Sequence, residues 1–317
     1  MSLLSLTLGR IAPQYKTLRE WSIIYDQIIS SKQVLPKTLE SHRLYVARIL
    51  ETFGTRALGS IRPYEIATLI RDIHARTPQT ARRVLIEARC LFSEAVNYGW
   101  LDRNPALDVK HLRAPVVRQR LSLDQWQRTY EWAELHSPPW VSRMLLLALL
   151  TGQRRADLQK MGFDDVWDGY LHVEQQKTGA RIALPLALRM DAVDCTLGHA
   201  IEMCRCYAAP GPTLLRKSTG AHLARAYMTA RFEKTREAAC GVAEVPRTAP
   251  SLHECRSLSE RLYRAQGVDT RTLLGHKRQS MTDMYNDDRG LERGKWKVLT
   301  LPHAATEQPE LKDEQPP

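Results

Sequence analysis

Residues Met144 to Leu158 read Met-Leu-Leu-Leu-Ala-Leu-Leu-Thr-Gly-Gln-Arg-Arg-Ala-Asp-Leu, an apolar run followed by a charged one. The apolar run predicts a buried helix that ends at Gly152. A new helix is expected next, with Arg154 in its first turn and Asp157 on the same face, where its carboxylate could orient the guanidinium. A guanidinium at a helix N-terminus suits a phosphate, although a surface Arg–Asp pair is the simpler interpretation.

Farther along the chain, two alternating segments, residues 169–175 and 181–185, flank Gln176-Lys-Thr-Gly179. Alternation of apolar and polar residues on both sides of a glycine-containing turn is typical of a β-hairpin. Lys177 is therefore expected near the tip of this hairpin, where a long cationic side chain can reach a ligand.

A third constellation is Ser251-Leu-His-Glu-Cys-Arg256. Ser251 and Glu254 have the spacing of a capping box, so we expect a helix to start there. His253 and Arg256 share a face near the start of that helix, and an imidazole beside a guanidinium suits proton transfer at a bound phosphate. A structural histidine paired with its own cap is the alternative.

The last constellation is Leu273-Leu-Gly-His-Lys277, followed by Met281-Thr-Asp-Met-Tyr285. The glycine predicts the end of a short helix, which places His276 in a turn, and Ser280 is expected to cap a further helix that carries Tyr285. A single tyrosine is usually a packing residue. Its phenolate is nevertheless a competent nucleophile where nearby cations or a base remove the proton.

The N-terminal part of the chain has the period of helices at residues 17–31, at 38–53, from Pro63 onward and at 78–98. These predict a small helical domain. The period is lost between residues 104 and 121, where basic residues gather around Pro115: Lys110, His111, Arg113, Arg118 and Arg120. Such a segment is either a solvated interdomain linker or a basic stretch that lies along a phosphate backbone.

The composition favours a polyanionic partner. The 317 residues include 46 Lys and Arg against 35 Asp and Glu, a formal charge of +11. Nucleic acid is the usual partner of such a chain, and an anionic membrane surface is the rival. No apolar run approaches the roughly 18–20 residues of a membrane helix, and the N-terminus lacks the features of a secretory signal. A cytoplasmic protein is therefore expected.

The six cysteines form no dense framework, which indicates reduced thiols. His199, Cys204 and Cys206 lie close together in the sequence and could ligate zinc. No fourth ligand stands at motif spacing, so buried thiols on a helix are the favoured interpretation. No metal site and no cofactor are predicted.

Six of these residues, taken in order, resemble the site of the tyrosine recombinase (phage integrase) family: Arg154, Lys177, His253, Arg256, His276 and Tyr285. The resemblance is strongest to the lambda-type phage integrases and covers about residues 15–301. It is carried by Thr151-Gly-Gln-Arg, Val173-Glu-Gln-Gln-Lys-Thr-Gly, His253-Glu-Cys-Arg-Ser-Leu-Ser, Leu273-Leu-Gly-His-Lys and Tyr285-Asn-Asp-Asp-Arg-Gly. An ordered set of this length is highly specific.

The resemblance implies a role for each residue around a scissile phosphate. Arg154 and Arg256 would clamp its non-bridging oxygens, and Lys177 would protonate the departing 5′-oxygen. The remaining roles are also implied by the family: His253 handles the tyrosine proton, His276 hydrogen-bonds the phosphate, Tyr285 is the nucleophile and Asp157 is an acidic residue behind the site. Cys255 replaces a usually aliphatic residue of the family and is expected to face the core.

The resemblance also implies a mainly α protein with a small β-sheet. A SAM-like helical core-binding domain would be joined to an α+β tyrosine-recombinase catalytic domain. The expected boundaries are 1–14 for a short N-terminal segment, 15–108 for the core-binding domain, 109–120 for the basic linker, 121–302 for the catalytic domain and 303–317 for a disordered tail. Residues 295–301 alternate like a strand that packs either on a neighbouring protomer or within its own. Candidate DNA-backbone contacts are Arg82, Arg83, Arg89, Lys110, Arg113, Arg118 and Arg120.

The function implied is site-specific recombination by a prophage integrase, through topoisomerase IB-like transesterification that requires neither metal nor ATP. The implied partners are double-stranded DNA at attachment-type core sites, a homotetramer on that DNA, and an excisionase or DNA-bending host protein. The protein would act in the bacterial cytoplasm, associated with the nucleoid. Alternatives are a chromosome-dimer or mobile-element recombinase, or a catalytically silent DNA-binding regulator. Lambda-type integrases also carry an N-terminal arm-binding domain, so this protein either recombines without arm binding or is truncated.

Overall fold

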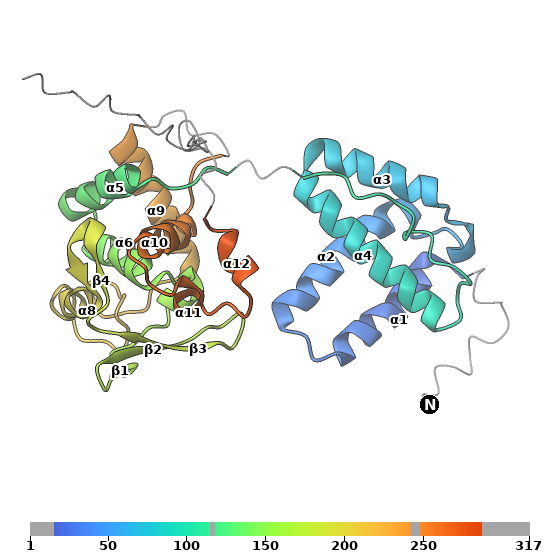
Figure 1. The fold of residues 1–317 in the computed structure, drawn as a ribbon. Helices are drawn as coiled ribbons and strands as arrows, with labels where there is room; N and C mark the ends of the chain where they lie inside the picture. The colour runs from blue at the N-terminus through green and yellow to red at the C-terminus, as the bar shows by residue number, and fades with distance from the viewer. Residues whose placement is uncertain (1–15, 115–117, 242–247, 287–317) are drawn as a thin grey trace, which may run out of the picture. The chain divides into compact units, whose positions relative to one another are not determined.

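The computed structural model describes residues 16–114, 118–241 and 248–286. The chain divides into two compact units, Met1–Val116 and Val117–Pro317 (Figure 1). Both are mainly helical, and the strands of the described residues all lie in the second unit. Within the described residues, no helix combines the length and the apolar character needed to cross a membrane.

Over residues 16–114, unit 1 contains four α-helices and one 3₁₀ turn: α1 (Leu18–Ser31), α2 (Pro36–Phe53), η3 (Leu58–Ser60), α3 (Pro63–Arg76) and α4 (Pro78–Asn97). The start of α1 is fixed by a capping box between Thr17 and Glu20. The other three helices each begin with a proline, whose missing N–H costs nothing in a first turn. The four predicted helices are thus confirmed.

The core of unit 1 is organised around Trp21, whose side chain is fully buried. Its ring lies 5.1 Å from that of Trp100, and its indole N–H donates to the carbonyl of Leu91 on α4 at 3.0 Å. An aromatic ring of this size buries a large apolar area while the polar atom keeps a partner. This contact fixes α1 against α4 and against the chain that follows α4.

Unit 2 is arranged around the apolar helix α6 (Trp140–Thr151), which packs against α5 (Leu123–His136), α8 (Leu197–Cys206) and α10 (Glu254–Ala265). A three-stranded antiparallel sheet of order β1-β2-β3 lies at one end of the unit, beside α11 (Figure 1). The remaining elements are α7 (Arg155–Leu158), β1 (Val166–Trp167), β2 (Tyr170–Glu174), β3 (Arg181–Pro185), β4 (Arg189–Met190), η4 (Asp191–Val193), β5 (Cys195–Thr196), α9 (Arg225–Cys240), α11 (Thr270–Leu274) and α12 (Gln279–Asp283).

The sequence correctly predicted the end of α6 and the hairpin. Gly152 has a φ of +61°, the left-handed conformation that glycine adopts without strain, and it ends α6 as expected. Strands β2 and β3 pair from Tyr170↔Pro185 to Glu174↔Arg181, so Lys177 lies in the connecting turn. Cys255 is buried, as predicted.

Two predicted helix caps are wrong. Ser251 and Glu254 do not form a capping box at the start of α10: the Ser251 hydroxyl accepts from Arg118 and the Glu254 carboxylate pairs with Arg120. The helix begins only at Glu254. Ser280 lies within α12 rather than before it, and that helix ends at Asp283. Tyr285 therefore stands in a turn after α12.

The predicted linker of residues 109–120 is held at both ends. The carbonyl of Arg113 hydrogen-bonds His74 at 3.0 Å, and that of Ala114 accepts from Gln79 at 3.4 Å, so this part belongs to unit 1. On the other side, the N–H of Gln119 donates to the carbonyl of Thr248 at 2.7 Å within unit 2. Residues 295–301, for which a strand was predicted, lie outside the described residues.

Candidate active site

Arg256 is the buried centre of the candidate site. Its side chain is 1% exposed at the start of α10. Nη1 donates to the carbonyl of Gly152 at 2.7 Å, and Nη2 donates to the carbonyl of Leu274 at 2.5 Å. Both carbonyls lie at the C-terminal ends of helices, where the last carbonyl groups have no hydrogen-bond partner within the helix. They are therefore available to accept from Arg256. The ends of α6 and α11 thus hold one guanidinium in a fixed orientation.

His276 follows the glycine that ends α11, as predicted, and lies against Arg256. Nε2 is 3.0 Å from Nη2 of Arg256, and Nδ1 is 2.9 Å from the hydroxyl of Thr282, which is itself fully buried. A guanidinium can only donate, so Nε2 of His276 must accept and Nδ1 must carry the proton. The imidazole is therefore neutral in this arrangement, with a single tautomer.

Arg154 is held by a buried glutamine from the hairpin that sequence reasoning did not single out. Its Nη1 donates to Oε1 of Gln175 at 2.8 Å. The amide of Gln175 donates in turn to Oε1 of Gln153 at 2.8 Å and to the carbonyl of Leu274 at 3.0 Å. Buried side-chain amides of this kind orient their neighbours because every polar atom has a fixed partner. Gln175 thereby joins Arg154, the hairpin and the Leu274–Gly275 turn.

Asp157 supports the hairpin rather than Arg154. Its side chain is 3% exposed, and Oδ1 accepts from the backbone N–H of Gln176 at 2.8 Å. The predicted orientation of Arg154 by this carboxylate is replaced by the Gln175 contact described above. Lys177, one residue beyond, is exposed in the turn, as expected of a side chain that must reach a ligand.

Tyr285 lies among the predicted catalytic residues. Its hydroxyl is 3.5 Å from Nε2 of His253, and its ring stacks on that of His276 with centroids 5.6 Å apart. The guanidinium carbon of Arg256 is 5.7 Å from the centre of the same ring. The structure therefore brings Tyr285 together with Arg256 and both histidines.

Positive charge dominates this site. Burial, and then the charges of Arg256 and Arg154, lower the pKa of His276 to about 4. Desolvation and the same two arginines lower the pKa of His253 to about 4 as well. Burial and the proximity of Arg154 lower the pKa of Arg256 to about 10, so its guanidinium remains charged at neutral pH. With Nε2 of His276 already occupied by Arg256, the neutral His253 is the imidazole placed to accept a proton from Tyr285, and the two arginines can bind an anion.

The seven predicted DNA contacts fall into two groups. Arg82 and Arg83 on α4 are exposed, and so are three residues of the linker: Lys110, Arg113 and Arg118. The other two, Arg89 and Arg120, have internal roles. The guanidinium of Arg89 donates to the carbonyl of Val109 at 2.6 Å and lies 2.7 Å from His111, so it fastens the linker to α4. Arg120 is 3% exposed.

Among the described residues, no three His, Cys, Asp or Glu side chains gather as a metal site, and on α8 Cys204 is buried while His199 and Cys206 are exposed.

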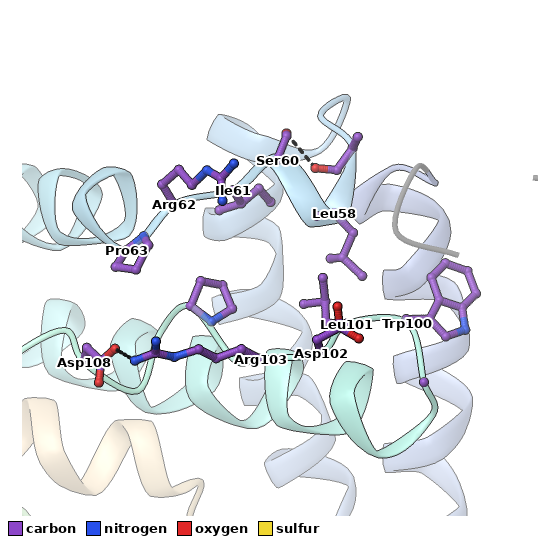
Figure 2. Close-up of a pocket in the computed structure, with 14 residues that line it drawn as sticks. Leu58, Ser60, Ile61, Arg62, Pro63, Trp100, Leu101, Asp102, Arg103 and Asp108 are labelled. Atoms are coloured by element: carbon purple, nitrogen blue, oxygen red, sulfur yellow. Dashed lines mark hydrogen bonds and ion pairs between the residues drawn. The ribbon is translucent and has the colours of Figure 1, made fainter. Parts of the chain in front are cut away.

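Unit 1 has a cavity of about 610 Å³ between residues 57–63 and 99–108 (Figure 2). Its side chains include the ion pair of Arg103 and Asp108, and none of the six predicted catalytic residues lines it.

Proteins of known type resemble this chain over most of its length. A model of the phage integrase family matches residues 119–290. The prophage integrase IntE of Escherichia coli (strain K12) is 36% identical over 285 residues, which cover 86% of this chain and 75% of that protein. The integrase of Enterobacteria phage P21 is 38% identical over 301 residues, which cover 90% of this chain and 77% of that protein.

Solved structures agree. A lambda integrase dimer bound to a COC′ core site has a TM-score of 0.84 and 31% identity, covering 94% of this chain and 85% of that one. A lambda integrase tetramer bound to a Holliday junction has a TM-score of 0.84 and 30% identity, covering 94% of this chain and 84% of that one. Family match, relatives and structures give one answer: this chain belongs to the phage integrase family of tyrosine recombinases.

Proposed function

We propose that this protein is a site-specific recombinase that cuts and rejoins double-stranded DNA through a 3′-phosphotyrosine at Tyr285. The observation that carries the proposal is the position of the Tyr285 hydroxyl, 3.5 Å from Nε2 of His253 and beside the Arg256 guanidinium. A phenol with a neutral imidazole within reach and fixed cations around it has the arrangement of an activated nucleophile.

The proposed chemistry is a transesterification at phosphorus. The Tyr285 oxygen attacks phosphorus in line and its proton passes to His253, which is neutral at pH 7 because its pKa is about 4. The bond from phosphorus to the 5′-oxygen breaks, and Lys177 gives that oxygen a proton. A phosphodiester is exchanged for a phosphotyrosine, so the reverse attack by a 5′-hydroxyl restores the DNA without an external energy source.

The two arginines would stabilise the charge of the transition state. Within the described residues, Arg154 has one hydrogen-bond partner, Gln175, and the Nε of buried Arg256 has none. Donors of Arg154 therefore remain for the non-bridging oxygens of a phosphate, in a region held rigid by carbonyl and glutamine contacts, and the buried Arg256 adds its fixed positive charge. Preorganised donors of this kind commonly contribute about 10²–10³-fold each to a reaction rate.

We further propose that the protein acts as a prophage integrase and assembles as a tetramer on core-type DNA sites. The prophage and phage integrases among its relatives, and the lambda integrase tetramer on a Holliday junction, support this assignment. The exposed basic residues of α4 and the linker are the proposed contacts to the DNA backbone: Arg82, Arg83, Lys110, Arg113 and Arg118.

The proposal is tested with negatively supercoiled plasmid, without metal or ATP. The wild-type protein should nick, swivel and reseal the plasmid, and Tyr285→Phe should not. Tyr64→Phe, which alters an exposed tyrosine of unit 1, is the matched control and should relax the plasmid normally. Equal relaxation by wild type and Tyr285→Phe would refute the assignment of the nucleophile.

A further inference from the structure

We infer that Arg120 is a positioning residue that holds Tyr285 in place for attack, so that the position of the nucleophile depends on the segment joining the two units. The inference rests on the proposed role of Tyr285 as nucleophile. The sequence suggested that Arg120 touches DNA as part of a basic linker. In the structure its side chain is instead 3% exposed, inside unit 2.

One guanidinium joins three parts of the site. Nη1 of Arg120 donates to Oε2 of Glu254 at 2.9 Å, at the start of α10. Nη2 donates to the carbonyl of Met284 at 2.6 Å, one residue before the nucleophile. The guanidinium carbon also lies 6.0 Å from the centre of the Tyr285 ring. The flat fork of an arginine can serve a carboxylate and a carbonyl at once, which a lysine ammonium on a flexible stem does poorly.

The backbone at Tyr285 needs such support because α12 has already ended at Asp283. The N–H of Tyr285 donates to the carbonyl of Thr282 at 2.9 Å, and the hydroxyl of Ser257 donates to the carbonyl of Tyr285 at 2.8 Å. Arg120 supplies the charged donor of the set. Charge-assisted hydrogen bonds are roughly twice as strong as neutral ones, so this contact should contribute most to holding the turn.

Arg120 itself is fixed by the chain on either side of it. The N–H of Gln119 donates to the carbonyl of Thr248 at 2.7 Å, and Arg118 donates to the hydroxyl of Ser251 at 3.1 Å. On the other side, Nη2 of Arg261 donates to the carbonyl of Leu121 at 2.7 Å. A shift of residues 118–121 along unit 2 would therefore be transmitted through Arg120 to the turn that carries Tyr285.

The first test needs no DNA. Protein labelled with 3-fluorotyrosine is examined by ¹⁹F NMR, and the Tyr285 resonance is identified by its loss in Tyr285→Phe. Arg120→Lys keeps the positive charge beside Glu254 but lacks the planar guanidinium that also binds the Met284 carbonyl. The turn that carries Tyr285 should then become less ordered, so the Tyr285 resonance should shift and sharpen. Arg128→Lys is the matched control, because Arg128 is an exposed arginine on α5 that pairs with Asp124 at 3.0 Å, and it should leave that resonance unchanged.

The second test uses negatively supercoiled plasmid. Because the charge is kept, Arg120→Lys should bind plasmid with the wild-type Kd while relaxing it on the order of a hundredfold more slowly, the cost of a nucleophile misplaced by about 1 Å. If wild type relaxes no plasmid, the proposed function fails, but the NMR result still decides whether Arg120 positions Tyr285.

The inference would be overturned by an unchanged Tyr285 resonance in folded Arg120→Lys, or by an equal shift in Arg128→Lys. Should Arg120→Lys fail to fold, the double variant Arg120→Met with Glu254→Gln replaces the buried ion pair by neutral groups of similar size. Such replacements are often neutral for stability. The same criterion then applies to its Tyr285 resonance.

Discussion

Nη2 of Arg256 lies 3.0 Å from Nε2 of His276, and this contact fixes the protonation of the imidazole. Because a guanidinium has no lone pair to offer, the histidine must accept there and donate from Nδ1 to Thr282. A second proton on the ring would face Arg256 inside the protein. The site therefore contains a histidine that stays neutral at pH values well below the usual pKa of its side chain.

The neutral state of His276 should make the protein sensitive to acid. Its pKa falls from 6.5 to about 4 on folding, so below pH 6.5 the unfolded chain binds a proton that the folded chain does not. Stability is then full above about pH 6.5 and is lost as the pH falls toward 4. His276→Gln removes this pH-dependent contribution to the free energy of unfolding. The stability difference between wild type and variant should shrink by roughly 2 kcal/mol from pH 7.5 to pH 5.

Urea denaturation of both proteins at the two pH values measures this difference. His253 contributes in the same direction but is present in both proteins, so it cancels. An identical difference at pH 7.5 and pH 5 would show that His276 titrates normally.

Gln175→Leu should impair both stability and relaxation. The substitution leaves the amide oxygen of Gln153 without its donor, which costs about 1–3 kcal/mol for a buried group, and removes one of the two donors to the carbonyl of Leu274. It also releases Arg154, so plasmid relaxation should fall by at least about tenfold. Gln127→Leu, at an exposed position of α5, controls for the general effect of the exchange. Relaxation at the wild-type rate would mean that Arg154 needs no support from the hairpin.

Gly152→Ala should destabilise unit 2 more than the same change at Gly169. Both glycines have positive φ, so each variant pays backbone strain of about 1–2 kcal/mol. A Cβ at Gly152 would also lie 2.9 Å from Cδ2 of Leu274 and 3.0 Å from the hydroxyl of Ser259, whereas at Gly169 it meets open space. Thermal unfolding of the two variants makes the comparison, and equal shifts in Tm would contradict the packing argument.

The arginines of α4 should separate into binding and structural residues. Arg82→Gln with Arg83→Gln should lower the salt dependence of duplex binding by about two phosphate contacts. Arg89→Gln should leave that slope nearly unchanged while destabilising unit 1, because its guanidinium binds the Val109 carbonyl. Fluorescence anisotropy of a labelled duplex over a range of NaCl concentrations gives the slopes. If Arg89→Gln lowered the salt dependence of binding as much as the double variant does, Arg89 would be a DNA contact after all.

Local signals predicted most of the fold. The first-turn proline Pro63, the glycine after α6 and the alternation around Lys177 each act within a few residues, so the elements they define could be predicted from the sequence. The caps at Ser251 and Ser280 were mispredicted. At Ser251, distant arginines engage both side chains of the expected box, and no local rule reports such competition.

The candidate catalytic residues were predicted as a set, but the supporting roles of Gln153, Gln175 and Arg120 were not. Gln153 contacts the carbonyl of Leu273, 120 positions along the chain, and Gln175 contacts that of Leu274 from 99 positions away. No sequence motif predicts that a glutamine will hydrogen-bond a carbonyl so far away along the chain. Arg120 carried a misleading signal, because a basic residue in a basic linker looks exposed until the fold buries it.

The covalent intermediate is the most direct test of the central claim. Protein incubated with supercoiled plasmid is denatured rapidly, digested with nuclease and protease, and analysed by mass spectrometry. We expect a nucleotide joined through a 3′-phosphate to the peptide that contains Tyr285, and its absence from Tyr285→Phe. A nucleotide on any other residue, or relaxation of the plasmid by Tyr285→Phe, would contradict it.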